Sequence, residues 1–161
     1  MHLIMGRSKK IILLDIDDTL FDTQRFIDSQ LIHYALYKEV PGVLEALSAH
    51  VFLGILSQGD SQLQMTKLQN TNIASYFSPK HIHIVEQKSL HFIEIFSEYS
   101  EMDEIIFVDD RLEHLALAKR NSPTIIAVWM KRGRYMQAKE NANFVPDYII
   151  TNLDELVPLV V

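Results

Sequence analysis

Three carboxylates, those of Asp15, Asp17 and Asp18, come at the end of a run of four aliphatic residues near the start of the chain. Such a run (residues 11–14) predicts a buried parallel strand, where neighbouring carboxylates repel one another unless a cation or a hydrogen-bond network holds them. Asp15 and Asp17 point the same way along a strand. One can therefore attack a substrate while the other transfers protons, both beside a shared metal ion. The structural alternative is a strand followed by an acidic helix cap at Asp18 or Thr19.

The elements that would position these residues follow from the rest of the pattern. Short aliphatic runs alternate with helical periodicity, which is typical of a parallel sheet with helices on both faces. Strands are expected over residues 11–16, 51–56, 82–85, 105–108, 125–130 and 148–150. We therefore expect an α/β fold, a Rossmann-like doubly wound three-layer α/β/α sandwich with a mainly parallel sheet, as a single domain of residues 1–161.

Helices are expected between the strands. Pro41 and Gly42 open one, and Asp60 or Ser61 caps a second that carries Leu63, Lys67 and Leu68 at helical spacing. Further on, the expected apolar face contains Leu90 and Ile93, with Phe92 and Phe96 as core residues rather than cofactor contacts. His81 and His83 alternate on a strand, and we expect a solvent-facing edge strand there rather than a metal site.

Polar residues follow several of the predicted strands at one edge of the sheet. In a doubly wound sheet, ligands bind beyond the carboxyl ends of the strands. The residues found there, besides the first carboxylates, are Ser57, Gln58, Gly59 and Asp60 after the second strand, Lys88 after the third, and Asp109 and Asp110 after the fourth. Each alone is explained as a cap, a turn residue or a solvated side chain. Together they predict one site.

The order and spacing of these residues resemble the four motifs of the haloacid dehalogenase-like (HAD) hydrolase superfamily, most of whose members are magnesium-dependent phosphatases. The resemblance covers residues 10–156. The first motif matches around Asp15, the second at Ser57, the third at Lys88 and the fourth at Asp109 and Asp110. Ser89 follows Lys88 where relatives often have proline, so the third motif rests on spacing, with Lys80 as its nearby competitor.

The resemblance implies a catalytic role for each carboxylate of the first motif. Asp15 would be the nucleophile that forms an aspartyl-phosphate, and Asp17 would protonate the leaving oxygen and then activate water. A magnesium ion would be held by Asp15, the backbone carbonyl of Asp17 and Asp110, with Asp109 as a water-mediated ligand. The cofactor expected from the resemblance is therefore Mg²⁺.

The resemblance also implies a set of groups that bind the phosphoryl oxygens. Ser57, Lys88 and the backbone amides around Gln58 and Gly59 would cradle these oxygens. Thr19 is placed with this group as a residue that supports the geometry of Asp17. The expected partner is a phosphorylated substrate, either a small molecule, a nucleotide or a macromolecule.

The insertion after the first motif is short. Residues 21–39 suffice for a minimal cap, one amphipathic helix with Ile27, Leu31, Tyr34 and Ala35 on a common face. They cannot form a closing domain, so the site suits a large substrate unless a partner subunit in a homo-oligomer supplies a wall. Residues expected either to contact substrate or to serve as surface and packing residues are Arg25, Tyr34, Tyr37, Arg111 and Arg132.

Composition narrows the classes of partner. The formal net charge of -6 argues against a general nucleic-acid binder, although Lys131, Arg132 and Arg134 form either a basic loop or a patch that attracts an anionic substrate. The absence of cysteine excludes disulfides and cysteine nucleophiles. Residues 1–10 lack signal-peptide order and no apolar run reaches membrane-spanning length, so we expect a cytoplasmic protein with no membrane partner.

Four functions compete for this pattern. A phosphatase is favoured over a halide-releasing enzyme because a halide leaving group needs no acid such as Asp17. A phospho-accepting receiver domain carries similar residues in a different order along the chain. The serious alternative to a phosphatase is a catalytically idle magnesium- and phosphate-binding module that recognises phosphorylated partners.

Overall fold

The part of the chain that the structure describes forms one six-stranded sheet. The computed structural model describes residues 8–139 and 143–161. The prediction about a signal peptide concerns residues 1–10, most of which lie outside the described residues. The strands are β1 (Lys10–Leu14), β2 (Phe52–Gln58), β3 (Ile82–Val85), β4 (Glu104–Asp109), β5 (Ile126–Met130) and β6 (Tyr148–Ile150). All their described pairings are parallel. The six predicted strands are thereby confirmed, each with bounds within two residues of those expected.

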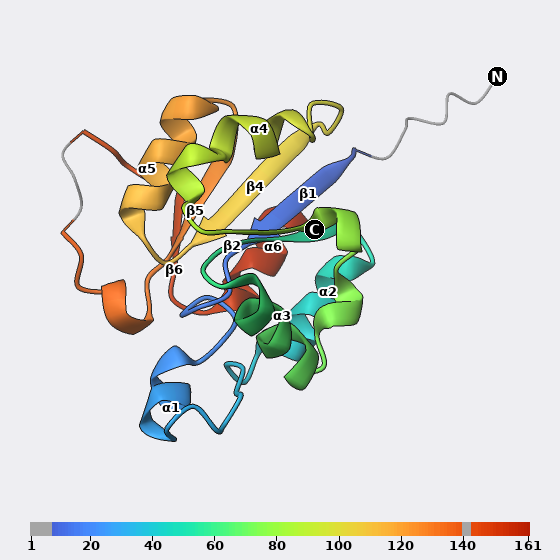
Figure 1. Cartoon of the computed structure of the whole chain (residues 1–161). Helices are drawn as coiled ribbons and strands as arrows, with labels where there is room; N and C mark the ends of the chain where they lie inside the picture. Colours follow the sequence, from blue (N-terminus) through green and yellow to red (C-terminus); the bar gives the residue numbers. More distant parts are fainter. Residues whose placement is uncertain (1–7, 140–142) are drawn as a thin grey trace.

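The sheet has the order β3-β2-β1-β4-β5-β6. This order is that of a Rossmann-like doubly wound fold, and it confirms the predicted fold class. The direction of winding reverses between β1 and β4, which lie side by side in the centre of the sheet (Figure 1). Beyond β1, the backbone N–H of Asp15 donates to the carbonyl oxygen of Val108 at 3.0 Å. The first and fourth motifs therefore meet at the point where such folds bind ligands.

Helices cover both faces of the sheet (Figure 1). One core lies under α2 (Val40–Ser48), α3 (Ser61–Asn70) and α6 (Val157–Val160), and the other under α4 (Phe92–Ser97) and α5 (Leu112–Asn121). Alternate residues of β1 enter opposite cores, Ile12 and Leu14 the first, Ile11 and Leu13 the second. Because both faces of β1 are buried, it reads as an unbroken aliphatic run.

Short helical turns connect these elements. They are η1 (Ala74–Tyr76), η2 (Pro79–His81), η3 (Lys88–Leu90), η4 (Gly133–Tyr135) and η5 (Leu153–Leu156). The predicted cap at Asp60 is confirmed, since its side chain accepts a hydrogen bond from the backbone N–H of Leu63. Among the described residues, none of the helices combines the length and apolarity needed to cross a membrane.

The insertion over residues 21–39 is short, as expected, but it is not one amphipathic helix. The helix α1 covers only Thr23–Asp28. Gln30 and Leu31 have φ angles of 60° and 65°, a left-handed conformation that ends a helix. Of the predicted common face, Ile27 and Leu31 are exposed, whereas Tyr34 packs against Phe26 with ring centroids 4.8 Å apart.

The predicted apolar face that contains Leu90 and Ile93 is not buried. Leu90 and Ile93 are 72% and 65% exposed, because the turn η3 precedes α4 and changes which positions face the sheet. Phe92 and Phe96 are buried, as predicted.

His81 and His83 do not face solvent, contrary to expectation. Only His83 lies on β3, which is an edge strand, and His81 ends the turn η2 before it. His81 is buried and His83 is half-buried. Their ring nitrogens lie 3.2 and 2.6 Å from the Tyr99 hydroxyl. Burial lowers the pKa of both histidines, which indicates a structural cluster of neutral rings around one hydroxyl.

Candidate active site

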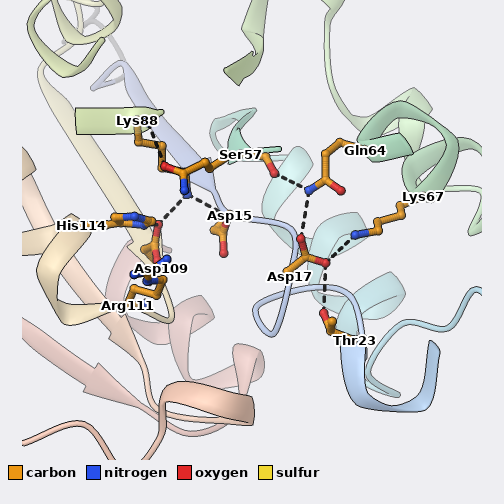
Figure 2. A network of polar contacts seen from close by, with 11 residues as sticks. Asp15, Asp17, Thr23, Ser57, Gln64, Lys67, Lys88, Asp109, Arg111 and His114 are labelled. Atoms are coloured by element: carbon orange, nitrogen blue, oxygen red, sulfur yellow. Dashed lines mark hydrogen bonds and ion pairs between the residues drawn. The ribbon is translucent and has the colours of Figure 1, made fainter. Parts of the chain in front are cut away.

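Three buried carboxylates meet where β1 and β4 end. Oxygen atoms of Asp15, Asp109 and Asp110 all lie within 4.8 Å of one another. The ammonium nitrogen of Lys88 donates to Asp15 Oδ1 at 2.8 Å and to Asp109 Oδ2 at 2.6 Å (Figure 2). Lys80, the competing lysine, is exposed on η2. The structure therefore brings together the predicted residues of the first, third and fourth motifs.

The charges in this cluster do not balance. Burial raises the pKa of Asp15 to about 6, with Lys88 opposing the rise. Burial and the charges of Asp15 and Asp109 raise the pKa of Asp110 to about 11. Burial alone would raise the pKa of Asp109 too, but Lys88 and His114 together outweigh burial and hold that pKa below its usual range. One ammonium thus leaves negative charge that a proton or a further cation must offset.

The two carboxylates of the fourth motif, Asp109 and Asp110, differ in how many of their oxygens have hydrogen-bond partners. Asp109 Oδ2 is shared by Lys88 and, at 3.2 Å, by His114 Nδ1, while Asp109 Oδ1 accepts from the backbone N–H of Arg111 at 2.8 Å. Oδ2 of Asp110 is buried and lacks a hydrogen-bond partner in the described parts of the chain. A buried carboxyl oxygen without a partner fits a metal ligand, since buried polar atoms are otherwise hydrogen-bonded.

Asp17 is held apart from this cluster by a second set of donors (Figure 2). Its Oδ1 accepts from Lys67 Nζ at 2.7 Å and from the Thr23 hydroxyl at 3.0 Å. Its Oδ2 accepts from Gln64 Nε2 at 3.1 Å. The sequence reasoning missed all three donors. A lysine on the same helical face as Leu68 was the available signal, because an ammonium on a buried face needs a carboxylate.

The predicted phosphate-binding residues occupy different surroundings. Ser57 is buried and its hydroxyl oxygen accepts from Gln64 Nε2 at 2.7 Å. Gln58 Oε1 accepts from the backbone N–H of Lys88 at 3.0 Å. Thr19 is buried; its carbonyl oxygen accepts from Arg132, and its hydroxyl has no hydrogen-bond partner in the described residues. The threonine that hydrogen-bonds the Asp17 carboxylate is Thr23, not Thr19.

A small pocket of about 70 Å³ opens between the two sets of carboxylates. Its lining residues are Asp15, Asp17, Gln58, Lys88, Asp110, Arg111, His114, Arg134 and Tyr135. Arg134 comes from the basic loop and donates to Asp18 Oδ2 at 2.8 Å. Arg132 instead stacks on Tyr37, with its Cζ 3.6 Å from the ring centroid. Of the two roles considered for these residues, substrate contact or packing, this contact is one of packing. The lining of the pocket thus combines carboxylates with the cationic side chains of Lys88, Arg111 and Arg134.

Comparison with solved structures identifies the fold. The chain has the fold of haloacid dehalogenase-like hydrolases, as expected from its motifs. A haloacid dehalogenase-like hydrolase from Burkholderia xenovorans is 19% identical, with a TM-score of 0.80 over 94% of this chain and 96% of that one. The HAD-hydrolase YfnB from Bacillus subtilis, solved bound to magnesium, is 14% identical, with a TM-score of 0.75 over 95% of this chain and 99% of that one.

A third similar structure has a different stated activity. The L-2-haloacid dehalogenase from Xanthobacter autotrophicus is 13% identical, with a TM-score of 0.69 over 94% of this chain and 98% of that one. No protein-family model and no curated protein matches the chain. Because proteins of this fold carry out more than one reaction, the residues of the site must decide the chemistry.

Proposed function

We propose that the protein is a magnesium-dependent phosphatase that hydrolyses a phosphate monoester through an aspartyl-phosphate on Asp15. The observation that carries this proposal is the arrangement of two carboxylates on one pocket. Asp15 lies in the charge cluster, and Asp17 is held on the other side by its own donors. In a halide-releasing reaction Asp17 would have no role as an acid, because a halide leaves without needing a proton.

Proton and phosphoryl transfer follow from these positions. A carboxylate oxygen of Asp15 attacks phosphorus, and the bond from phosphorus to the ester oxygen breaks as Asp17 gives that oxygen a proton. Asp17 then takes a proton from water, whose oxygen attacks the same phosphorus. The bond to Asp15 breaks, inorganic phosphate leaves, and both carboxylates return to their starting states. Lys88 favours the ionised, attacking form of Asp15.

The residues present fit a divalent cation. Asp15, the backbone carbonyl of Asp17 and Asp110 would hold Mg²⁺, with Asp109 acting through water, and oxygen ligands of this kind suit that ion. When bound, the ion supplies positive charge that offsets the oxygens of the phosphoryl group. The unbalanced charge of the cluster and the orphaned Asp110 oxygen support this assignment.

Asp110→Ala is expected to weaken the binding of Mg²⁺ that supports activity more than Asp109→Ala does. The reason is that Asp110 has an unused oxygen, whereas the oxygens of Asp109 are taken by neighbouring donors. Titrating activity against Mg²⁺ for both variants should show the half-saturating concentration rising at least about tenfold for Asp110→Ala, the typical loss of one ligand interaction. Equal or reversed effects would show that the ligand assignment is wrong.

The stabilisation given by Mg²⁺ is expected to grow as pH rises from 5 to 8. With the pKa of Asp15 at about 6 and that of Asp110 at about 11, the metal-free folded state holds protons that the unfolded chain has already lost. That state therefore loses stability as pH rises, while Mg²⁺ needs the ionised carboxylates. Thermal unfolding with and without Mg²⁺ measures the difference, in which other titrating groups cancel. Asp110→Asn should flatten the trend; a trend of opposite sign would contradict it.

The proposed activity is tested by incubating purified protein with Mg²⁺ and a panel of phosphate esters. The expected result is turnover that requires a divalent cation and disappears with a chelator. Tight magnesium-dependent phosphate binding without turnover of any ester would favour the idle binding module instead. Halide release from 2-haloacids, without ester hydrolysis, would favour a dehalogenase.

The open site also bears on the substrate. With α1 limited to Thr23–Asp28, one wall of the site is short, which favours a large phosphorylated substrate such as a nucleotide, a polymer end or a phosphoprotein. A second copy of the chain in a homo-oligomer would provide an alternative wall. The net charge of -6 argues against nucleic acid as a general partner, and the composition favours a cytoplasmic setting.

A further inference from the structure

We propose that Gln64 and Lys67 of α3 are positioning residues for the reaction, with Gln64 setting the Ser57 hydroxyl as a hydrogen-bond donor toward the phosphoryl group. The two residues lie three positions apart on one helical face, both buried (Figure 2). This inference rests on the proposed phosphatase function. It goes beyond that function by assigning roles to residues outside the four motifs.

The polarity of the Gln64 amide follows from its neighbours. Once Asp17 has given its proton to the leaving oxygen, its ionised carboxylate only accepts hydrogen bonds, so the group that then faces Asp17 Oδ2 is the amide nitrogen, at 3.1 Å. The same nitrogen lies 2.7 Å from Ser57 Oγ. Its two hydrogens serve these two acceptors, so Ser57 Oγ accepts from Gln64 and its own proton remains for another partner. Phosphoryl oxygens are acceptors, so this is the orientation that they require.

Lys67 provides the second half of the arrangement. Its side chain is 6% exposed, and its ammonium lies 2.7 Å from Asp17 Oδ1 and 5.1 Å from the centroid of the Phe21 ring. A buried ammonium of this kind has little freedom to move away from its carboxylate. Thr23 of α1 donates to the same oxygen. Both oxygens of Asp17 are therefore fixed, which sets the direction in which the carboxylate presents itself to the pocket.

The role of Gln64 is tested by calorimetric titration with inorganic phosphate in the presence of Mg²⁺. Gln64→Met should weaken phosphate binding roughly tenfold, the usual value of a hydrogen bond to a charged group. Gln64→Glu should weaken it further, because the carboxylate accepts the hydrogen bond of the Ser57 hydroxyl, which then points away from phosphate, and adds negative charge. Gln69→Met, on the exposed side of the same helix, is the matched control and should bind phosphate as the wild type does.

A double-mutant cycle separates this role from a general loss of structure. In a Ser57→Ala background, Gln64→Met should change phosphate affinity by no more than about twofold, since the hydroxyl that it orients is gone. An equal loss in both backgrounds, or wild-type affinity for Gln64→Met, would overturn the assignment. Because the titration needs no turnover, it decides the role of Gln64 even if no ester is hydrolysed.

The role of Lys67 is tested by the dependence of kcat/KM on the leaving group. A mispositioned acid slows esters of poor leaving groups selectively, because a good leaving group departs unprotonated. Lys67→Met should lower kcat/KM for an alkyl phosphate by roughly 100-fold and for 4-nitrophenyl phosphate by at most about threefold. Lys67→Arg should restore most of the alkyl activity, and Lys80→Met, an exposed lysine, should change neither.

A merely structural role for Lys67 predicts a different outcome. Equal loss with both esters in a variant that retains its thermal transition, with no rescue by arginine, would overturn the positioning role. If the wild type hydrolyses neither ester, the proposed phosphatase function fails, and that result is distinct from the failure of either positioning role.

Discussion

Asp15→Asn is expected to lose at least about 10³-fold in kcat/KM with every ester that the wild type hydrolyses. The amide keeps the shape of the side chain but is a very poor nucleophile. The carboxylate that it replaces is buried and accepts from Lys88 at 2.8 Å, which gives it a fixed position at the end of β1. Steady-state rates in Mg²⁺, together with acid-quenched labelling by a radioactive ester, measure both turnover and the covalent intermediate.

The control for this variant separates the loss of the nucleophile from the loss of a carboxylate in general. Asp154→Asn makes the same chemical change on η5, where the side chain is exposed, and it should leave rate and labelling unchanged. Wild-type turnover by a folded Asp15→Asn protein would exclude the covalent mechanism. Labelling that persists in Asp15→Asn would move the nucleophile to another carboxylate.

The sheet and the rim of the site could be predicted from the sequence because two simple rules act on long stretches. Strands buried on both faces read as unbroken apolar runs, as over residues 11–14 of β1 and 105–108 of β4. Parallel strands end at the same edge, so the residues after them converge. Asp15, Lys88 and Asp109 are far apart in the chain, yet a rule about strand ends suffices to bring them together.

The partners of Asp17 could not be predicted in this way. Gln64 and Lys67 are 47 and 50 residues away, on a helix whose rotation about its axis depends on packing against the sheet. Periodicity gives the face of a helix only approximately. Leu90 and Ile93 show a related limit: the pattern placed them on one buried helical face, but Leu90 belongs to the turn η3 and both are exposed.

The short insertion shows a second limit of sequence reasoning. Residues 21–39 contain apolar residues at helical spacing, but the chain leaves the helical conformation at Gln30 and Leu31. Their positive φ angles are unusual for residues other than glycine, and neither residue type signals them. The wall that this segment gives to the site is correspondingly smaller than a single long helix would provide.

Lys88→Met is expected to lower the free energy of unfolding by about 3–5 kcal/mol at pH 7 without a divalent cation, the usual cost of leaving buried charges unpaired. Methionine fills a similar volume, so the loss is mainly electrostatic. The Lys88 ammonium is 1% exposed and pairs with Asp15 and Asp109, which would face Asp110 with no cation among them. Denaturant unfolding measures the change. Lys10→Met, which removes a partly exposed ion pair with Glu104, should cost less than about 1 kcal/mol.

Changes in pH and in Mg²⁺ separate this electrostatic cause from poor packing. Without the ammonium, the pKa values of Asp15 and Asp109 rise in the folded state, which then holds protons that the unfolded chain releases, so the loss in stability should grow from pH 5 to pH 8. Mg²⁺ should restore more stability to Lys88→Met than it adds to the wild type, because it supplies the missing charge at the same carboxylates. A loss that is independent of both pH and Mg²⁺ would mean that Lys88 supports the core by its hydrocarbon stem alone. In that case the charge of Lys88 could not be what keeps Asp15 in its ionised, nucleophilic form.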